Sequence, residues 1–167
     1  MTYELKPIHK EAIPAALERA HRYRLLNEPT QAGSICRDIL EVDADNKEAL
    51  ILLLLALTDE FPSRMSTAVQ EARDVLGRLS DEYDRIYFEG VIYERRAKAH
   101  FDKQGPGSGH VAYEWFLKAM ESYDRADKMS SSENDEARLR WNTCARILMN
   151  NPSLTRAPED QTPQLLE

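Results

Sequence analysis

Apolar residues recur along this chain at the three- and four-residue spacing of amphipathic helices, and no segment shows the alternation of a strand. The pattern predicts helices at 10–27, 29–42, 47–60, 66–79, 81–101, 110–129 and 134–148. Residues 1–9 are expected to form a lead-in segment. Residues 150–167 are rich in proline and polar side chains, which predicts a disordered tail. The chain is therefore expected to be all-α, with one helical domain at 10–149.

The stretch from Ile13 to Ala44 contains the clearest pair of helices. Pro29 occupies a position that is favoured in the first turn of a helix, directly after the break at Asn27 and Glu28. Small or apolar residues recur at helical spacing where the two helices would cross, at Ala20, Tyr23, Ala32, Cys36, Ile39 and Ala44. This arrangement predicts a tight antiparallel hairpin.

Two further helices constrain how the domain packs. The helix expected at 47–60 is apolar on nearly every side from Ala49 to Leu57, so neighbours must cover it all round. Gly90 lies inside the fifth helix, where glycine costs about 1 kcal/mol relative to alanine. Its presence predicts that another backbone crosses the helix closely there. The segment DKQGPGSG, residues 102–109, is predicted to be a flexible loop.

The helical pattern repeats along the chain. An offset of 34 residues takes Ala20 to Leu54 and Tyr23 to Leu57. The spacing recurs two residues late in the fourth helix and again in the fifth and sixth helices, which are separated by a 17-residue insertion centred on the Gly-Pro-Gly loop. The recurring positions are Ala68, Ala72, Val75, Gly90, Tyr93, Ala119, Tyr123 and Ala126. The predicted units are about 13–46, 47–82 and 83–133, followed by a capping helix at 134–149.

A helix–turn–helix unit with this period resembles the tetratricopeptide repeat family. The matching positions are Ala20, Tyr23, Gly90, Tyr93, Ala119, Tyr123 and Ala126. Leu54 and Leu57 depart from the family's small-residue and tyrosine pair, and Ala44, Ser80 and Ser131 replace its closing proline. The runs ERRAKAH and RWNTCAR look similar to bacterial members rather than to co-chaperones. The resemblance implies antiparallel hairpins stacked as a right-handed superhelix, an α-solenoid, with about three units and a capping helix.

In such a stack the first helix of each hairpin lines a concave groove. The expected groove residues are Leu17, His21, Arg24, Ile51, Leu55, Tyr87, Val91, Glu94, Arg138 and Asn142. An apolar middle with Arg24 and Arg138 at its ends suits an extended or helical peptide with hydrophobic anchors. Ile51 and Leu55 fit a core position equally well, because buried aliphatic residues are usually core. Some family members hold a terminal carboxylate with Lys and Asn, but Leu17 and His21 fill the first-unit places here, so we expect no such clamp.

Composition narrows the class of partner. The chain has 22 Lys and Arg against 29 Asp and Glu, a net charge of −7, which argues against general attraction to nucleic acid. The most apolar run, Ile51 to Leu57, is too short to span a bilayer, and the first residues lack a signal-peptide core. We expect a cytoplasmic protein with no membrane or nucleic-acid partner. Cys36 and Cys144 lie in helical apolar patterns and are expected to be buried and reduced.

No residues have the spacing of a catalytic, cofactor or metal site. His9, His21, His100 and His110 have no companion Cys or His at ligand spacing. The GPGSG sequence follows a helix and lacks the Lys-Ser/Thr of a phosphate-binding loop. The charged run from Glu94 to Lys98 is expected to be a solvated helix face. We expect no enzyme activity and no cofactor.

These observations predict a non-enzymatic adaptor or scaffold that binds a peptide or protein segment in the concave groove. The alternative is a self-associating structural subunit of a larger assembly. In that case the apolar third helix and the exposed side of Trp141 would form the subunit contact. An RNA-binding helical repeat would instead need a basic groove.

Overall fold

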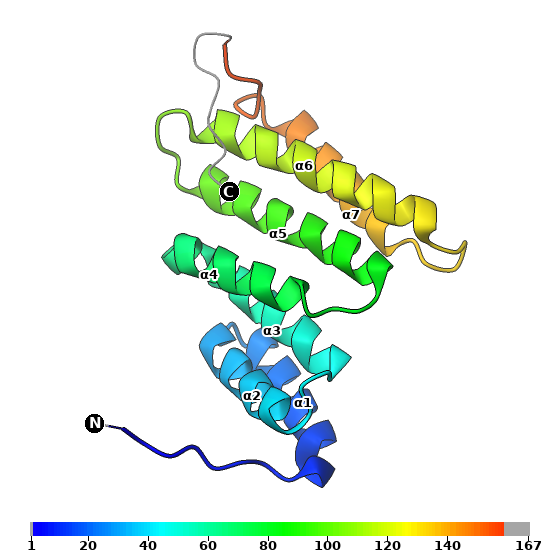
Figure 1. Ribbon diagram of the computed structural model, residues 1–167. Helices are drawn as coiled ribbons and strands as arrows, with labels where there is room; N and C mark the ends of the chain where they lie inside the picture. The colour runs from blue at the N-terminus through cyan, green and yellow to red at the C-terminus, as the bar shows by residue number, and fades with distance from the viewer. Residues whose placement is uncertain (1, 159–167) are drawn as a thin grey trace. The chain divides into compact units, whose positions relative to one another are not determined.

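A computed structural model describes residues 2–158 (Figure 1). These residues form a short 3-10 helix, η1, and seven α-helices, with no strand among them, which confirms the all-α class. The elements are η1 (Lys10–Ala12), α1 (Ile13–Leu25), α2 (Pro29–Val42), α3 (Lys47–Asp59), α4 (Phe61–Leu76), α5 (Glu82–Asp102), α6 (Ser108–Met129) and α7 (Glu136–Asn150).

The helices form two compact units, Met1–Leu79 and Ser80–Glu167. We call them unit 1 and unit 2. The division falls three residues before the boundary predicted between the second and third repeat units, at 82 and 83.

Unit 1 is built from antiparallel helices that contact their neighbours in sequence, α1 with α2, α2 with α3 and α3 with α4. Helix α1 also contacts α3. The apolar helix α3 is covered as predicted: Leu50, Leu54 and Leu57 are buried, and of its leucines and isoleucine only Ile51 and Leu55 are partly exposed. Ala20 and Leu54, which are 34 residues apart, are both fully buried.

The start of α4 differs from the sequence prediction. Phe61, Pro62 and Ser63 were expected to break the chain before a helix at 66, but α4 begins at Phe61. Proline is tolerated in the first turn of a helix because no intrahelical partner exists for its missing N–H. The break is instead a kink at Arg64, whose backbone is non-helical at φ −143° and ψ 51°. Phe61 is fully buried and anchors this first turn.

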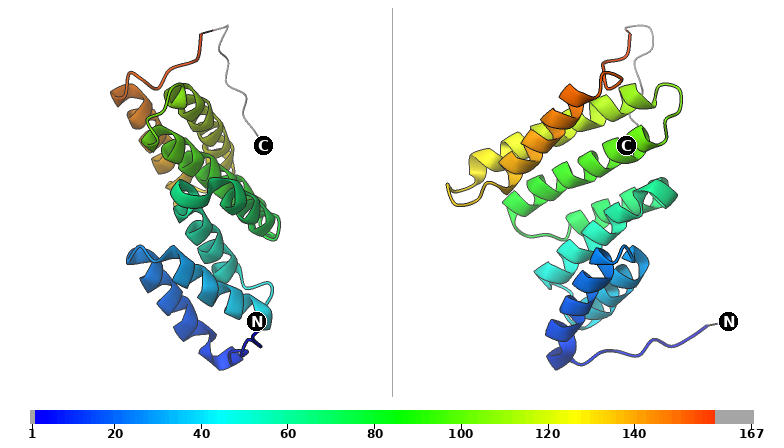
Figure 2. Two further views of the ribbon diagram at one scale, coloured as in Figure 1. Left: turned by 90° about the vertical axis from the view of Figure 1, so that its left-hand side faces the viewer. Right: turned by 180° about the vertical axis from the view of Figure 1, so that it is seen from behind.

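In unit 2, helix α6 packs against both α5 and α7 and lies alongside each of them (Figure 1, Figure 2). Gly90 of α5 meets the Tyr123 ring of α6, because a Cβ added at Gly90 would lie 2.7 Å from Tyr123 Cε1. The predicted close crossing is therefore present, with an aromatic ring rather than a backbone as the neighbour. Ala119, Tyr123 and Ala126 are fully buried along this contact.

The chain beyond α7 follows a defined path as far as residue 158, although the sequence predicted disorder from residue 150. Asn151 Nδ2 donates a hydrogen bond to the Ile147 carbonyl at 2.7 Å, at the end of α7. Leu154 and Ala157 are buried. The prediction for 159–167 lies outside the described residues.

Each unit contains one buried cysteine, as the apolar patterns predicted. Cys36 and Cys144 are both free thiols with no exposed surface. Burial raises the pKa of each thiol to about 12, because the charged thiolate is poorly solvated there. No helix within residues 2–158 is long and apolar enough to cross a membrane.

Candidate functional site

The face that α1 and α3 share in unit 1 contains a pocket of about 280 Å³. Its lining residues are His21, Lys47, Glu48, Ile51, Leu52 and Leu55. All except His21 come from α3, where positions 48, 51, 52 and 55 fall on one side at helical spacing. His21, Ile51 and Leu55 were predicted from sequence to line one groove, and they line one pocket.

Two polar side-chain contacts join α1 to α3 in unit 1. At the rim His21 Nε2 lies 3.3 Å from Glu48 Oε1, and both side chains are about half exposed. Arg24 Nε donates to Asp59 Oδ2 at 2.7 Å, with both side chains largely buried. The sequence predicted Arg24 as a cationic end of the groove, but Asp59 neutralises it. Leu17, the remaining predicted residue of α1, is buried.

The predicted groove residues of α5 lie in the interior of unit 2. Tyr87, Val91 and Glu94 are buried, so their side chains are not available to a partner. Arg140 of α7 reaches this side of α5 and donates hydrogen bonds to the Tyr87 hydroxyl at 3.0 Å and to Glu94 at 3.1 Å. Helical spacing places these three residues on one side of α5, but it could not show that Arg140 of α7 would bond to two of them.

The two predicted residues of α7 remain at the surface or near it. Arg138 is exposed and pairs with Asp127 at 3.1 Å and with Asp135 at 3.3 Å. Asn142 is half-buried. Neither residue lines the unit 1 pocket.

A buried polar cluster, which we call the Glu94 cluster, lies inside unit 2. The Glu94 carboxylate is 1 % exposed and accepts hydrogen bonds from the Tyr123 hydroxyl at 2.6 Å, from Arg140 and from Lys98. Burial would raise the pKa of Glu94, but the bonds from Lys98 and Tyr123 and the charge of Arg140 lower it below its ordinary value. Burial raises the pKa of Tyr123, and the neighbouring Glu94 charge raises it further. The carboxylate therefore stays charged and the phenol stays protonated, which is a stable arrangement inside the unit.

The charged run around this cluster is largely internal, although the sequence predicted a solvated face. Arg96 is buried, and its guanidinium carbon lies 3.7 Å from the centre of the Trp115 ring. Such stacking is a favourable cation–π geometry. The spacing of Glu94 and Lys98 could have signalled a helical ion pair, but Tyr123 and Arg140 are too distant in sequence to be recognised as partners.

Among residues 2–158 no group of three His, Cys, Asp or Glu side chains is placed to hold a metal ion. Comparison of the chain with protein-family models, with curated proteins and with solved structures gave no significant match. The helical hairpins and their buried small residues are consistent with a helical repeat. The tetratricopeptide resemblance stays a prediction from the repeat spacing.

Proposed function

We propose that this chain is a non-enzymatic adaptor of the tetratricopeptide type, with hairpins stacked as an α-solenoid. In this proposal unit 1 holds a segment of a partner protein against the face of α1 and α3. The observation that carries it is the pocket of about 280 Å³ floored by Ile51, Leu52 and Leu55. Partly exposed aliphatic side chains that line a preformed hollow are typical of an anchor site for a peptide.

The charges around the pocket indicate what the partner supplies. His21 lies beside Glu48, and Arg24 is paired with Asp59, so each of these side chains already has a polar partner within unit 1. Covering the aliphatic side chains of the pocket floor would therefore contribute most of the binding free energy at this site. We therefore expect an uncharged segment that inserts one leucine, isoleucine or methionine side chain.

Replacing Ile51 with lysine is expected to weaken such a peptide at least tenfold. The change removes part of the apolar floor, and covering one aliphatic side chain contributes about 1.5–3 kcal/mol, where 1.4 kcal/mol is tenfold in affinity. Peptides would be selected from a displayed random library against the full chain. Fluorescence polarisation would then measure the dissociation constant of a selected peptide for the parent chain and for Ile51→Lys.

Leu25→Lys is the matched control, because Leu25 lies on α1 outside the pocket lining and is 85 % exposed. It should leave the dissociation constant unchanged. Equal binding by Ile51→Lys and the parent chain, or selected peptides without an aliphatic anchor, would exclude this site.

A second candidate function is self-association through α7. It is favoured by Trp141, which is 37 % exposed, and by Leu139, which is 63 % exposed. The contact cannot include most of α3, because its leucines are covered inside unit 1. If it forms, light scattering at micromolar concentration should give a multiple of the 19.2 kDa chain mass, and Trp141→Ala should reduce it. A monomer at that concentration would reject this candidate.

A further inference from the structure

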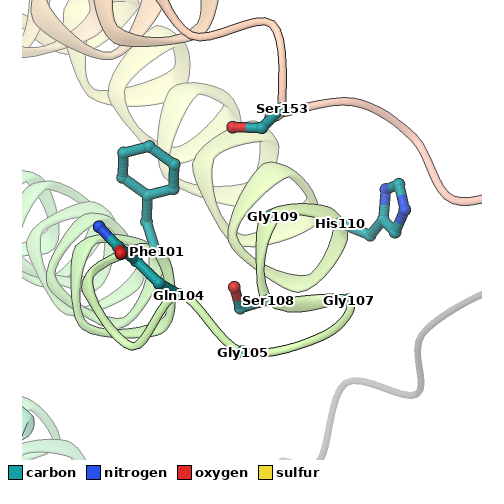
Figure 3. A pocket seen from close by; sticks show the side chains of 8 residues that line it. All are labelled: Phe101, Gln104, Gly105, Gly107, Ser108, Gly109, His110 and Ser153. Atoms are coloured by element: carbon teal, nitrogen blue, oxygen red, sulfur yellow. The ribbon is translucent and has the colours of Figure 1, made fainter.

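The segment from Asn151 to Ala157, which we call the C-terminal strap, crosses the first turn of α6. Leu154 is 4 % exposed and Ala157 is also buried, so the strap has two apolar anchors. The His110 Nδ1–H donates a hydrogen bond to the Thr155 carbonyl at 2.8 Å. Figure 3 shows Ser153 of the strap above Gly109, with His110 extending from the helix on the side away from Phe101. The strap is thus held by two buried side chains and by one hydrogen bond from His110.

Gly109 is the point of closest approach between the strap and α6. A Cβ added at Gly109 would lie 2.4 Å from the Ser153 carbonyl oxygen and 3.3 Å from its carbonyl carbon. Both atoms are backbone, which cannot move aside as the end of a flexible side chain can. Residue 109 must therefore be glycine for the strap to sit where it does.

The first turn of α6 has no side chain of its own that stabilises its N-terminal end. Its N-cap residue is Gly107, at φ 74°, which provides no side-chain hydrogen bond, and the first turn contains no acidic residue. The amides of Ser108, His110 and Val111 already bond the carbonyls of Gly105 and Gly107, but the turn still has the partial positive charge of a helix N-terminus. The Ser153 and Thr155 carbonyl oxygens lie against this turn, where their partial negative charge is favourable beside the positive end of the helix.

The strap also bounds a pocket of about 410 Å³ at this end of unit 2 (Figure 3). The pocket lies between Phe101 at the end of α5, the glycine-containing loop and Ser153. Seven of its eight lining residues belong to 101–110, and Ser153 is the one contributed by the strap. Movement of the strap would therefore remove one wall while leaving the others in place.

We propose that the C-terminal strap is a releasable latch for unit 2. When it is seated, it stabilises the first turn of α6 and closes one wall of the 410 Å³ pocket. When it leaves, the first turn loses the two neighbouring carbonyl dipoles and the His110–Thr155 hydrogen bond, and the pocket opens along that side. The strap has few anchors, and segments with few buried contacts open at low free-energy cost.

The test uses the opposite effects that alanine has at Gly109 in the two states of the latch. With the strap seated, Gly109→Ala forces it off, so the melting temperature should fall by about 3 °C or more. Hydrogen exchange of the amides at 108–112 should become at least tenfold faster. In a chain whose strap is already released by Leu154→Ser and Ala157→Ser, the same change should raise the melting temperature by about 2 °C, because alanine favours helix over glycine.

Gly105→Ala is the matched control, because a Cβ there would meet no atom within 4 Å. It should leave melting and exchange unchanged. A rise in melting temperature for Gly109→Ala in both backgrounds would overturn the latch. If the Gly109→Ala chain does not fold, hydrogen exchange of the Leu154→Ser chain serves as the test. Faster exchange of the amides at 108–112 supports the latch, and unchanged exchange there overturns it.

Discussion

Replacing Glu94 with alanine is expected to lower the free energy of unfolding by about 3–5 kcal/mol at neutral pH, the usual range for removing one partner of a buried ion pair. The carboxylate is 1 % exposed and is hydrogen-bonded to Tyr123, Arg140 and Lys98. Its removal leaves the Tyr123 hydroxyl without its acceptor and the partly buried Arg140 guanidinium without its carboxylate partner, with only the Tyr87 hydroxyl still accepting from it. Urea denaturation at pH 7 would measure the loss.

Glu121→Ala is the control, because Glu121 is exposed on α6. Surface substitutions of this kind usually change stability by less than about 0.5 kcal/mol. A loss for Glu94→Ala that is no larger than for Glu121→Ala would show that the cluster does not stabilise unit 2.

The same carboxylate gives the parent chain a defined pH dependence. The pKa of Glu94 is lowered in the folded state, so unfolding favours proton uptake as the pH falls. Its contribution is fully present above the ordinary value of 4.5 and is lost as the pH falls from there through the folded pKa. Stability measured between pH 7 and pH 3 should therefore decline less steeply for Glu94→Gln than for the parent chain. If the stability of the two chains falls equally over this pH range, Glu94 is not responsible for the pH dependence.

Replacing Gly90 with alanine is expected to destabilise unit 2 by about 1–3 kcal/mol, the usual cost of overpacking a core. The added Cβ would lie 2.7 Å from Tyr123 Cε1 and 3.2 Å from Ser122 Cβ. The Tyr123 ring cannot easily move, because its hydroxyl is bonded to Glu94 and the side chain has no exposed surface. Helix propensity alone predicts the opposite sign, a gain of about 1 kcal/mol. Thermal and urea denaturation would both show whether Gly90→Ala lowers or raises the stability of the chain.

Gly33→Ala is the matched control, since Gly33 is also buried in a helix. The nearest atom to its added Cβ would be the Arg37 guanidinium nitrogen at 3.2 Å, at the end of a flexible side chain that can move. We expect this substitution to be neutral or stabilising. If both glycine variants are stabilised, the close contact at Gly90 does not limit the packing.

Several features of the fold were accessible from sequence because they depend on local spacing. The periodicity of apolar residues located all seven helices of the described chain, and Pro29 marked the first residue of α2. Gly90 signalled a close contact because glycine is unfavourable in a helix unless something requires it. The start of α4 was misplaced because Phe61 and Pro62 allow either a break or a first helical turn.

The sequence predicted groove residues in both units, but among them only His21, Ile51 and Leu55 of unit 1 line a common pocket, and the reason is physical. Helical spacing assigns residues to faces, so it brought His21, Ile51 and Leu55 together correctly. It cannot tell which side chains of a later helix will reach a given face, and Arg140 of α7 bonds Tyr87 and Glu94 of α5. The strap was missed because its proline and polar residues resemble a disordered tail. Its seat depends on Gly109, more than 40 residues earlier in the chain.

The two buried cysteines give each unit its own chemical reporter. Cys36 lies in unit 1 and Cys144 in unit 2, and neither thiol has exposed surface in the folded chain. With a pKa of about 12, each thiol is almost entirely protonated at neutral pH and reacts slowly with maleimides. A maleimide therefore modifies each sulfur only when the surrounding helices open. Peptide mass spectrometry of the labelled chain separates the opening rates of the two units in one sample, with no engineered probe.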